Sequence, residues 1–179
     1  MSRLESADLA RFFRQLDKHI SKQFDAPPVK FSMIAVGGTN LTLRGWKPST
    51  KDVDFMIEGV DLGKVKRWAR DAAPDVPAHM WDAPYVFSTT LPDEYQTEHH
   101  ETFTNFDVSL LSAIDIASTK IGRLDQPDIE DIHLINKQGV GREEILERSE
   151  RILALGGYAS PQEAREKIDI FKAISRDWT

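Results

Sequence analysis

The spacing of apolar residues predicts a helix and then a strand at the start of the chain. The helix is expected to run to about Ser21, because its apolar positions recur every three or four residues: Leu9, Phe12, Phe13, Leu16 and Ile20. A capping box formed by Ser2 and Glu5 predicts where this helix begins. The mostly apolar residues 31–36 then predict a buried strand that enters a tight turn at a pair of glycines.

The same criteria predict the elements of the rest of the chain. They are a short helix over 41–46, a strand over 51–58, a helix over 62–73, one or two strands over 99–111, and helices over 112–124, 128–136, 143–155 and 160–174. Prolines between residues 74 and 92 predict loops with one short strand near Tyr85. The pattern as a whole predicts an α+β protein, with a mixed core followed by a helical C-terminal third.

Composition narrows the classes of protein that this chain can belong to. The 179 residues include no cysteine, which excludes disulfides, cysteine-ligated zinc, iron–sulfur clusters and thiol catalysis. No apolar run approaches the roughly 20 residues that span a bilayer, and the N-terminus lacks the apolar stretch of a signal peptide. A cytoplasmic protein with no membrane partner is therefore expected.

The distribution of charge is uneven along the chain. The formal net charge is −6, which argues against a generally basic nucleic-acid binder, yet residues 1–70 carry 13 basic and 8 acidic side chains. Two basic clusters lie in that segment: Arg11, Arg14, Lys18 and Lys22, and then Lys64, Lys66, Arg67 and Arg70. These clusters either contact the phosphates of an RNA acceptor or are ordinary solvated helix faces.

Two aspartates on the strand predicted over 51–58 are candidate metal ligands. Asp52 and Asp54 are two residues apart, so on a strand both carboxylates project to the same side. Two adjacent carboxylates repel each other unless a cation lies between them, and Mg²⁺ is the cation that oxygen ligands suit best. The alternative is a pair of solvated carboxylates on an exposed face of the sheet.

The turn after the first strand is a candidate phosphate site. Gly37 and Gly38 allow the backbone to turn sharply and expose its amides, and the Thr39 hydroxyl can add a further donor. No lysine follows in the spacing of a Walker loop, and no dinucleotide-binding glycine pattern is present. The glycine pair is also compatible with a plain turn.

A third carboxylate lies on a later strand. Asp107 alternates with Phe106 and Val108, so it is expected on the polar face. If that strand neighbours the strand of Asp52 and Asp54, three carboxylates converge and can hold two metal ions for an in-line displacement. The five histidines support no catalytic dyad, because His19, His79 and His133 are isolated and His99 and His100 point to opposite faces of a strand.

Together these residues resemble the signature of the nucleotidyltransferase superfamily that includes DNA polymerase β. The shared pattern is Gly37-Gly38, a thirteen-residue interval and then Asp52-x-Asp54 before an apolar residue. The layout is similar to the small branch related to abortive-infection type IV toxin nucleotidyltransferases, in which a strand like that of Asp107 precedes a helix with a lysine and an arginine. The resemblance covers about residues 30–136.

The resemblance implies a fold and a set of roles. It implies a mixed β-sheet flanked by helices, which we assign to residues 1–139. The helical pattern of residues 140–179 predicts an extension packed on this domain. Asp52, Asp54 and Asp107 would be catalytic and would hold two Mg²⁺ ions. Nucleotide binding would fall to the glycine turn and to a later helix: Gly37, Gly38, Thr39, Lys120 and Arg123. Asp128 and Asp131 are expected to act structurally, through a helix cap and a buried ion pair.

The implied reaction is transfer of a nucleoside monophosphate from a nucleoside triphosphate to a hydroxyl, with release of pyrophosphate. The acceptor can be an RNA end, a protein or a small molecule, because this fold supports many substrates. Two further hypotheses accompany it. One is a toxin with the same chemistry and an antitoxin protein as its partner, and the other is an inactive member that binds a nucleotide or a protein partner without catalysis.

Overall fold

The computed structural model describes residues 3–23 and 30–178, which divide into two compact units. The first unit is formed by Met1–Ala83 with Thr97–Leu111, and the second by Pro84–Gln96 with Ser112–Thr179. The chain thus passes between the units three times, after residues 83, 96 and 111, whereas the sequence predicts a single boundary at residue 139. Within the described ranges, none of the helices combines the length and the apolar character that crossing a membrane requires.

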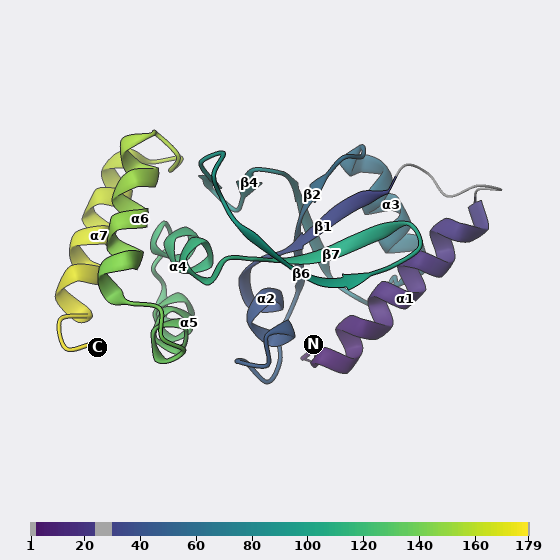
Figure 1. The fold of residues 1–179 in the computed structure, drawn as a ribbon, viewed down its shortest axis with the longest axis horizontal. Coiled ribbons are helices and arrows are strands. Elements are labelled where there is room, and N and C mark those ends of the chain that lie inside the picture. The colour runs from purple at the N-terminus through teal and green to yellow at the C-terminus, as the bar shows by residue number, and fades with distance from the viewer. Residues whose placement is uncertain (1–2, 24–29, 179) are drawn as a thin grey trace. The chain divides into compact units, whose positions relative to one another are not determined.

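The first unit contains a five-stranded mixed sheet and three helices (Figure 1). Its elements are α1 (Ser6–Gln23), β1 (Phe31–Ala35), α2 (Gly37–Leu43), β2 (Val53–Glu58), α3 (Leu62–Ala72), β3 (Ala78–Asp82), β6 (Thr97–Thr102) and β7 (Phe106–Leu111). The strand order is β3-β2-β1-β7-β6. β1 is antiparallel to β2 and parallel to β7, so the central strand separates the two strands that carry the candidate carboxylates.

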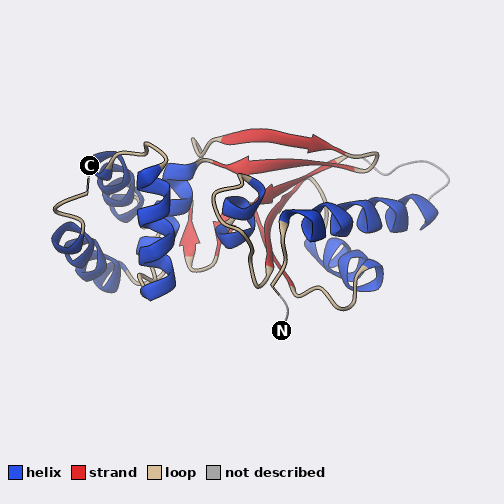
Figure 2. Ribbon diagram, turned by 90° about the horizontal axis from the view of Figure 1, so that it is seen from below, coloured by secondary structure: helices blue, strands red, loops and turns tan. Residues whose placement is uncertain are grey.

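α1 and α3 cover one face of this sheet (Figure 2). The apolar side chains of both helices pack against alternate residues of the central strands, which form one continuous core that includes Phe13, Phe55 and Phe106. Alternation along β2 and β7 then directs the residues between core positions to the other face of the sheet. Asp54 and Asp107 lie on that face, because their neighbours Phe55 and Phe106 belong to the core.

The second unit is mainly helical. It contains the hairpin of β4 (Tyr85–Val86) and β5 (Thr89–Thr90), followed by α4 (Ala113–Ile121), α5 (Gln126–Lys137), α6 (Arg142–Ala154) and α7 (Pro161–Ile174). An isolated bridge joins Thr89 to Tyr158, and the Tyr158 hydroxyl donates to the Ser118 carbonyl at 2.8 Å. Burial in this contact raises the pKa of Tyr158 to about 12, which keeps the hydroxyl protonated as a donor.

The predicted elements are present, with four corrections. α2 spans Gly37–Leu43, so the short helix predicted over 41–46 begins earlier, at the glycine pair itself. The sequence pattern does not predict β3, because its five residues lie in a proline-rich stretch that resembles a loop. β2 begins at Val53, so Asp52 precedes the strand and does not lie on it. The predicted capping box involves Ser2, which lies outside the described residues, and α1 begins later, where the Glu5 amide donates to the Asp8 carboxylate at 3.0 Å.

Candidate nucleotide-binding site

The glycine pair allows β1 to pass directly into α2. Gly37 has a φ of 54°, a left-handed backbone conformation that residues other than glycine rarely adopt. A Cβ atom on Gly38 would lie 2.6 Å from the Thr50 hydroxyl oxygen, so this position also excludes a side chain unless Thr50 moves. The tight turn predicted at these glycines is confirmed, and it begins a helix of seven residues.

Thr39 joins this turn to the two aspartates. Its hydroxyl donates to the Asp52 carbonyl oxygen at 3.0 Å and accepts from the Asp54 amide at 2.9 Å. Thr39 is fully buried, so these two bonds hold the start of α2 against the start of β2 in an environment where an unpaired polar group is costly. The hydroxyl proton is therefore used within the protein, and a phosphate contact by Thr39 stays a prediction.

Asp54 lies beside the end of β1. Its carbonyl oxygen accepts from the Val36 amide at 3.1 Å, which places the residue next to the turn, and it is only 7% exposed. Asp52 is half-buried, and its carbonyl accepts from the hydroxyls of both Thr39 and Thr50. The bonds of the Thr39 hydroxyl to the backbone of Asp52 and Asp54 thus bring both aspartates of the motif to the glycine turn.

The structure places His79 beside Asp54. β3 pairs in parallel with β2, His79 is the register partner of Asp54, and its Nδ1 atom lies 3.3 Å from the Asp54 Oδ1 atom. The histidine side chain is 55% exposed, so it forms the solvent-facing side of this contact. The sequence alone leaves His79 isolated, because its pattern does not predict β3 and no local spacing relates the histidine to Asp54.

Asp107 does not join this group. The register pairs Asp107 with Ser32 at the beginning of β1, whereas Asp54 lies beside Val36 beyond its end. Four residues along a strand span about 13 Å, and β1 also lies between the two carboxylates. The condition for convergence, that the strand of Asp107 neighbours the strand of Asp54, is therefore not met in this structure.

Asp107 has a partner of its own at the far end of the strand. The Lys30 ammonium lies 2.9 Å from its Oδ1 atom, and both side chains are partly exposed. The hydrogen bond from Lys30 is the largest influence on this carboxyl, and together with one from Thr102 it lowers the pKa of Asp107 below the ordinary value of 3.8.

The donor set at the turn fits one Mg²⁺ ion better than two. Within the described ranges, no three histidine, aspartate or glutamate side chains lie where they could share a metal ion. Mg²⁺ is commonly held by one or two carboxylates while substrate phosphates and water complete its octahedral shell. Asp52 and Asp54 can supply those carboxylates, whereas a site with three converging carboxylates and two metals does not match this arrangement.

Two of the predicted nucleotide ligands belong to the second unit: Lys120 in α4, and Arg123 just after its C-terminal end. Lys120 is 3% exposed, and its Nζ atom lies 2.9 Å from the Asp128 Oδ1 atom and 2.9 Å from the Asp131 Oδ2 atom. Arg123 contacts both oxygens of Asp128, at 2.8 and 3.1 Å, and its guanidinium stacks over the Phe87 ring. The predicted buried ion pair is thus confirmed for the two aspartates, while the cap of α5 is provided by Asp125.

The pKa of Asp128 reflects this pairing. Burial alone would raise it, but the hydrogen bonds and charges of Arg123 and Lys120 together outweigh burial and lower the pKa below 3.8.

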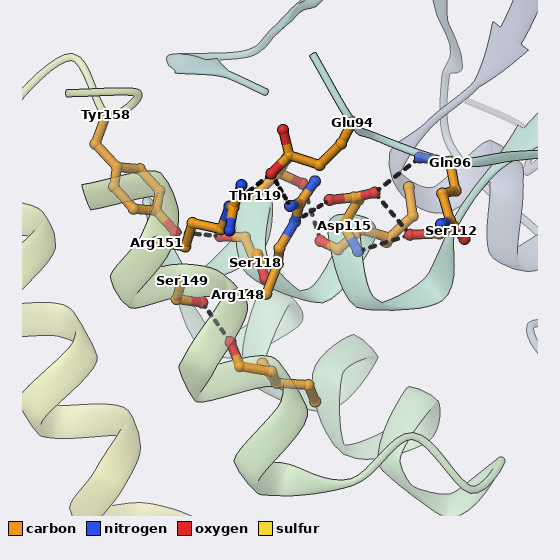
Figure 3. Close-up of polar contacts among 12 residues, drawn as sticks. Glu94, Gln96, Ser112, Asp115, Ser118, Thr119, Arg148, Ser149, Arg151 and Tyr158 are labelled. Atoms are coloured by element: carbon orange, nitrogen blue, oxygen red, sulfur yellow. Dashed lines mark hydrogen bonds and ion pairs between the residues drawn. The ribbon is translucent and has the colours of Figure 1, made fainter. Parts of the chain in front are cut away.

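A second buried pair lies in the same unit, where the Arg148 Nε atom donates to Asp115 at 2.7 Å and its Nη1 atom donates to Glu94 at 3.1 Å (Figure 3).

Comparison with known proteins identifies the fold. No family model matches the chain, and no curated protein matches it either. A solved structure does: an antigenic nucleotidyltransferase-like protein from Paracoccidioides brasiliensis, with a TM-score of 0.56 and 18% identity over 98% of this chain and 92% of that one. The fold is nucleotidyltransferase-like. Within this nucleotidyltransferase-like fold, the glycine turn and the two aspartates lie together in the first unit.

Proposed function

We propose that the protein is a nucleotidyltransferase that transfers a nucleoside monophosphate from a nucleoside triphosphate to a hydroxyl acceptor. The observation that carries this proposal is the Thr39 hydroxyl, which bonds to the backbone of both Asp52 and Asp54. A turn suited to phosphate oxygens and a carboxylate pair suited to Mg²⁺ are thereby held as one site. The nucleotidyltransferase-like fold supports the same reaction class.

The chain's own residues bind and orient the reactants. The Gly37-Gly38 turn binds the β- and γ-phosphates through its amides. Asp52 and Asp54 hold the cation, which when bound supplies positive charge against the triphosphate. The acceptor oxygen bonds to the α-phosphorus while the bond from that phosphorus to the bridging oxygen breaks, so pyrophosphate leaves and the acceptor proton passes to solvent. Much of the rate then comes from positioning and charge neutralisation.

A second candidate function is nucleotide binding without transfer. It is favoured by the separation of Asp107 from Asp54, because the resemblance assigns the third carboxylate to the metal site and to the acceptor hydroxyl. This candidate uses the same turn and the same Mg²⁺ ligands. It differs only in turnover, which makes the two separable in one experiment.

The test pairs binding with turnover in two variants of β2. Asp54→Asn removes the charge of the carboxylate beside the turn, and Glu58→Gln makes the same change at the exposed end of the same strand. Titration calorimetry with a non-hydrolysable triphosphate and Mg²⁺ should show binding that Asp54→Asn weakens at least tenfold and Glu58→Gln leaves unchanged. Equal affinity of the two variants would contradict the site itself.

Turnover is measured with triphosphates labelled at the α-phosphate, incubated with whole-cell RNA, protein and small molecules. Label that enters one of these pools with Mg²⁺, and that is absent with Asp54→Asn, supports transfer and identifies the acceptor class. Binding without label in any pool supports the second candidate instead. The two results exclude each other, so the experiment decides between an enzyme and a binding protein.

A toxin role is a narrower form of the first proposal and rests on the resemblance over residues 30–136. Expression in a bacterial host should arrest growth, Asp54→Asn should restore it, and Glu58→Gln should not. Co-expression of a cognate antitoxin should also restore growth. Normal growth with active wild-type protein would exclude the toxin role and leave the transferase proposal intact.

A further inference from the structure

α1 and α3 lie side by side on one face of the sheet, which joins the two basic clusters of the sequence into one surface. The Trp68 indole Nε1 atom of α3 donates to the Gln23 side chain of α1 at 3.0 Å, and both helices contribute to the same core. The joined surface, called the basic helical face below, consists of Arg11, Arg14, Lys18 and Lys22 of α1 with Lys64, Lys66, Arg67 and Arg70 of α3.

These cations point away from the core. At 100° per residue, the α1 cations centre opposite the buried Leu9, Phe12 and Leu16. On α3, Arg67 and Arg70 lie opposite the buried Val65, and Lys64 and Lys66 flank that buried side. All eight are exposed. Among the described residues, only two of the eight form ion pairs, Arg11 with Asp8 and Arg70 with Asp71. Positive charge thus accumulates on this face of a chain whose net charge is −6.

A cavity opens beside this surface, between α3 and the edge strand β3. Its volume is about 300 Å³, which suits a small planar group such as a nucleobase. Lys66 and Arg70 are its charged lining residues, and the other wall is apolar. That wall is formed by Ala69, Pro74, Val76, Ala78 and Met80. Of the described residues that line the cavity none is acidic, so it suits an apolar group attached to an anion.

We propose that the basic helical face binds single-stranded RNA, with phosphates on its cations and one unpaired base in the cavity. The α1 cations span about 17 Å of helix, which suits several consecutive phosphates. A lipid surface fits less well, because the large exposed apolar side chains of the described residues (Tyr85, Leu155, Ile170 and Ile174) all lie in the second unit. A duplex fits less well too, since its bases are not free to enter a cavity.

The edge of the sheet connects this cavity to the candidate site. Along β3, Ala78 and Met80 line the cavity, and His79 between them contacts Asp54 on the opposite face. An RNA strand that leaves the cavity and passes around the edge strand β3 therefore arrives at Asp54. This connection makes RNA the acceptor, a step that rests on the proposed function, whereas RNA binding itself does not depend on transfer.

The test measures binding of a fluorescent oligouridylate of about 15 nucleotides by anisotropy at about 50 and 200 mM KCl. The double variant Lys66→Glu/Arg70→Glu should weaken binding at least tenfold at the lower salt concentration. It should also reduce the slope of log affinity against log salt by about 1.4, because each phosphate that is no longer neutralised lowers the slope by about 0.7. The control Lys137→Glu/Arg165→Glu changes the charge equally on exposed helix positions of the second unit and should weaken binding less than threefold.

A matched ligand tests the cavity separately from the charge. An abasic oligomer with the same number of phosphates should bind about tenfold more weakly than the oligouridylate, because it has no base to enter the cavity. Equal binding of the two oligomers, equal effects of the two double variants, or no binding at either salt concentration would each overturn the proposal. The oligomers are titrated without triphosphate or Mg²⁺, so RNA binding is measured independently of the candidate site. Failure of this inference and failure of the proposed transferase site therefore produce different results.

Discussion

In the first unit, Asp54 and Asp107 on the polar face of the sheet have exposed partners, whereas in the second unit Asp128 is paired in the interior. Asp54 contacts a histidine that is 55% exposed, and Asp107 contacts a lysine that is 42% exposed. In the second unit, Asp128 and its partner Lys120 are both almost fully buried. The same residue types therefore stand in two different electrostatic environments.

This difference indicates which charges a ligand can use. A carboxylate with an exposed partner can exchange that contact for a cation or a substrate at small cost, because exposed ion pairs contribute little. A buried pair cannot, because removing one partner leaves a desolvated charge. We therefore expect substitutions in the second unit to act on stability and substitutions around Asp54 to act on binding.

The largest effect is expected for Asp128→Ala. Loss of this carboxylate takes away one of the two carboxylates that contact the buried Lys120 and also removes a contact of Arg123, which should lower the free energy of unfolding by about 3–5 kcal/mol. Urea unfolding measures this change. Glu130→Ala, at an exposed position of the same helix, is the control and should change stability by less than about 0.5 kcal/mol.

The contribution of Asp128 should also depend on pH. Its pKa is lower in the folded protein than the ordinary 3.8, so the unfolded state binds the proton more tightly. The stabilisation is therefore fully present above about pH 4 and decreases as the pH falls through the folded-state pKa. The wild-type protein should lose stability in that acidic range faster than Asp128→Ala does, and parallel curves would contradict this assignment.

A smaller loss of stability, about 3 kcal/mol, is expected for Lys120→Met, which keeps an unbranched side chain but removes the charge between two carboxylates. Because the ammonium group is committed to Asp128 and Asp131, triphosphate affinity measured well below the melting temperature should stay within twofold. A tenfold fall in affinity would instead support the phosphate role that the resemblance assigns to Lys120.

The sequence predicts local relations in this fold better than distant ones. The glycine turn, the two aspartates and the buried partners of Asp128 follow from spacing within about twenty residues, where helix and strand periodicity determine which side chains meet. The position of Asp107 depends on the register between β1 and β7, which are separated by about seventy residues of chain and by the strand order. Alternation identifies the face of Asp107 but not its level along the strand.

The contact of His79 with Asp54 is a second long-range relation that the sequence does not predict. This contact requires β3 to pair with β2, and β3 is a short edge strand among prolines that hydrophobic alternation alone does not reveal. The basic clusters of α1 and α3 are visible in the sequence as two separate stripes. Only the packing of both helices on one sheet face shows that they form one surface.

An intermediate effect, on binding and not on stability, is expected for His79→Gln. The imidazole contacts the Asp54 carboxylate, and loss of a side chain that orients a metal ligand commonly weakens metal affinity at least tenfold. Binding of Mn²⁺ in place of Mg²⁺, followed by electron paramagnetic resonance, measures this directly. His100→Gln, at an exposed position of β6, is the control, and equal affinities of both variants would show that His79 does not orient Asp54.

The smallest effect is expected for Asp107→Asn, although the resemblance gives this residue a catalytic role. Its ion pair with Lys30 is partly exposed, so the free energy of unfolding should fall by less than about 1 kcal/mol after solvent screening. Because the pKa of Asp107 is lowered in the folded protein, this contribution to stability is present above about pH 4 and is lost as the pH falls further.

Turnover of Asp107→Asn makes the comparison decisive for the first unit. Because Asp107 lies about 13 Å along β1 from the level of Asp54, the variant should retain activity within about threefold, whereas Asp54→Asn abolishes it. A decrease as large as that of Asp54→Asn would contradict this separation, because the strand order and the register along β1 both keep the Asp107 carboxylate away from the level of Asp54.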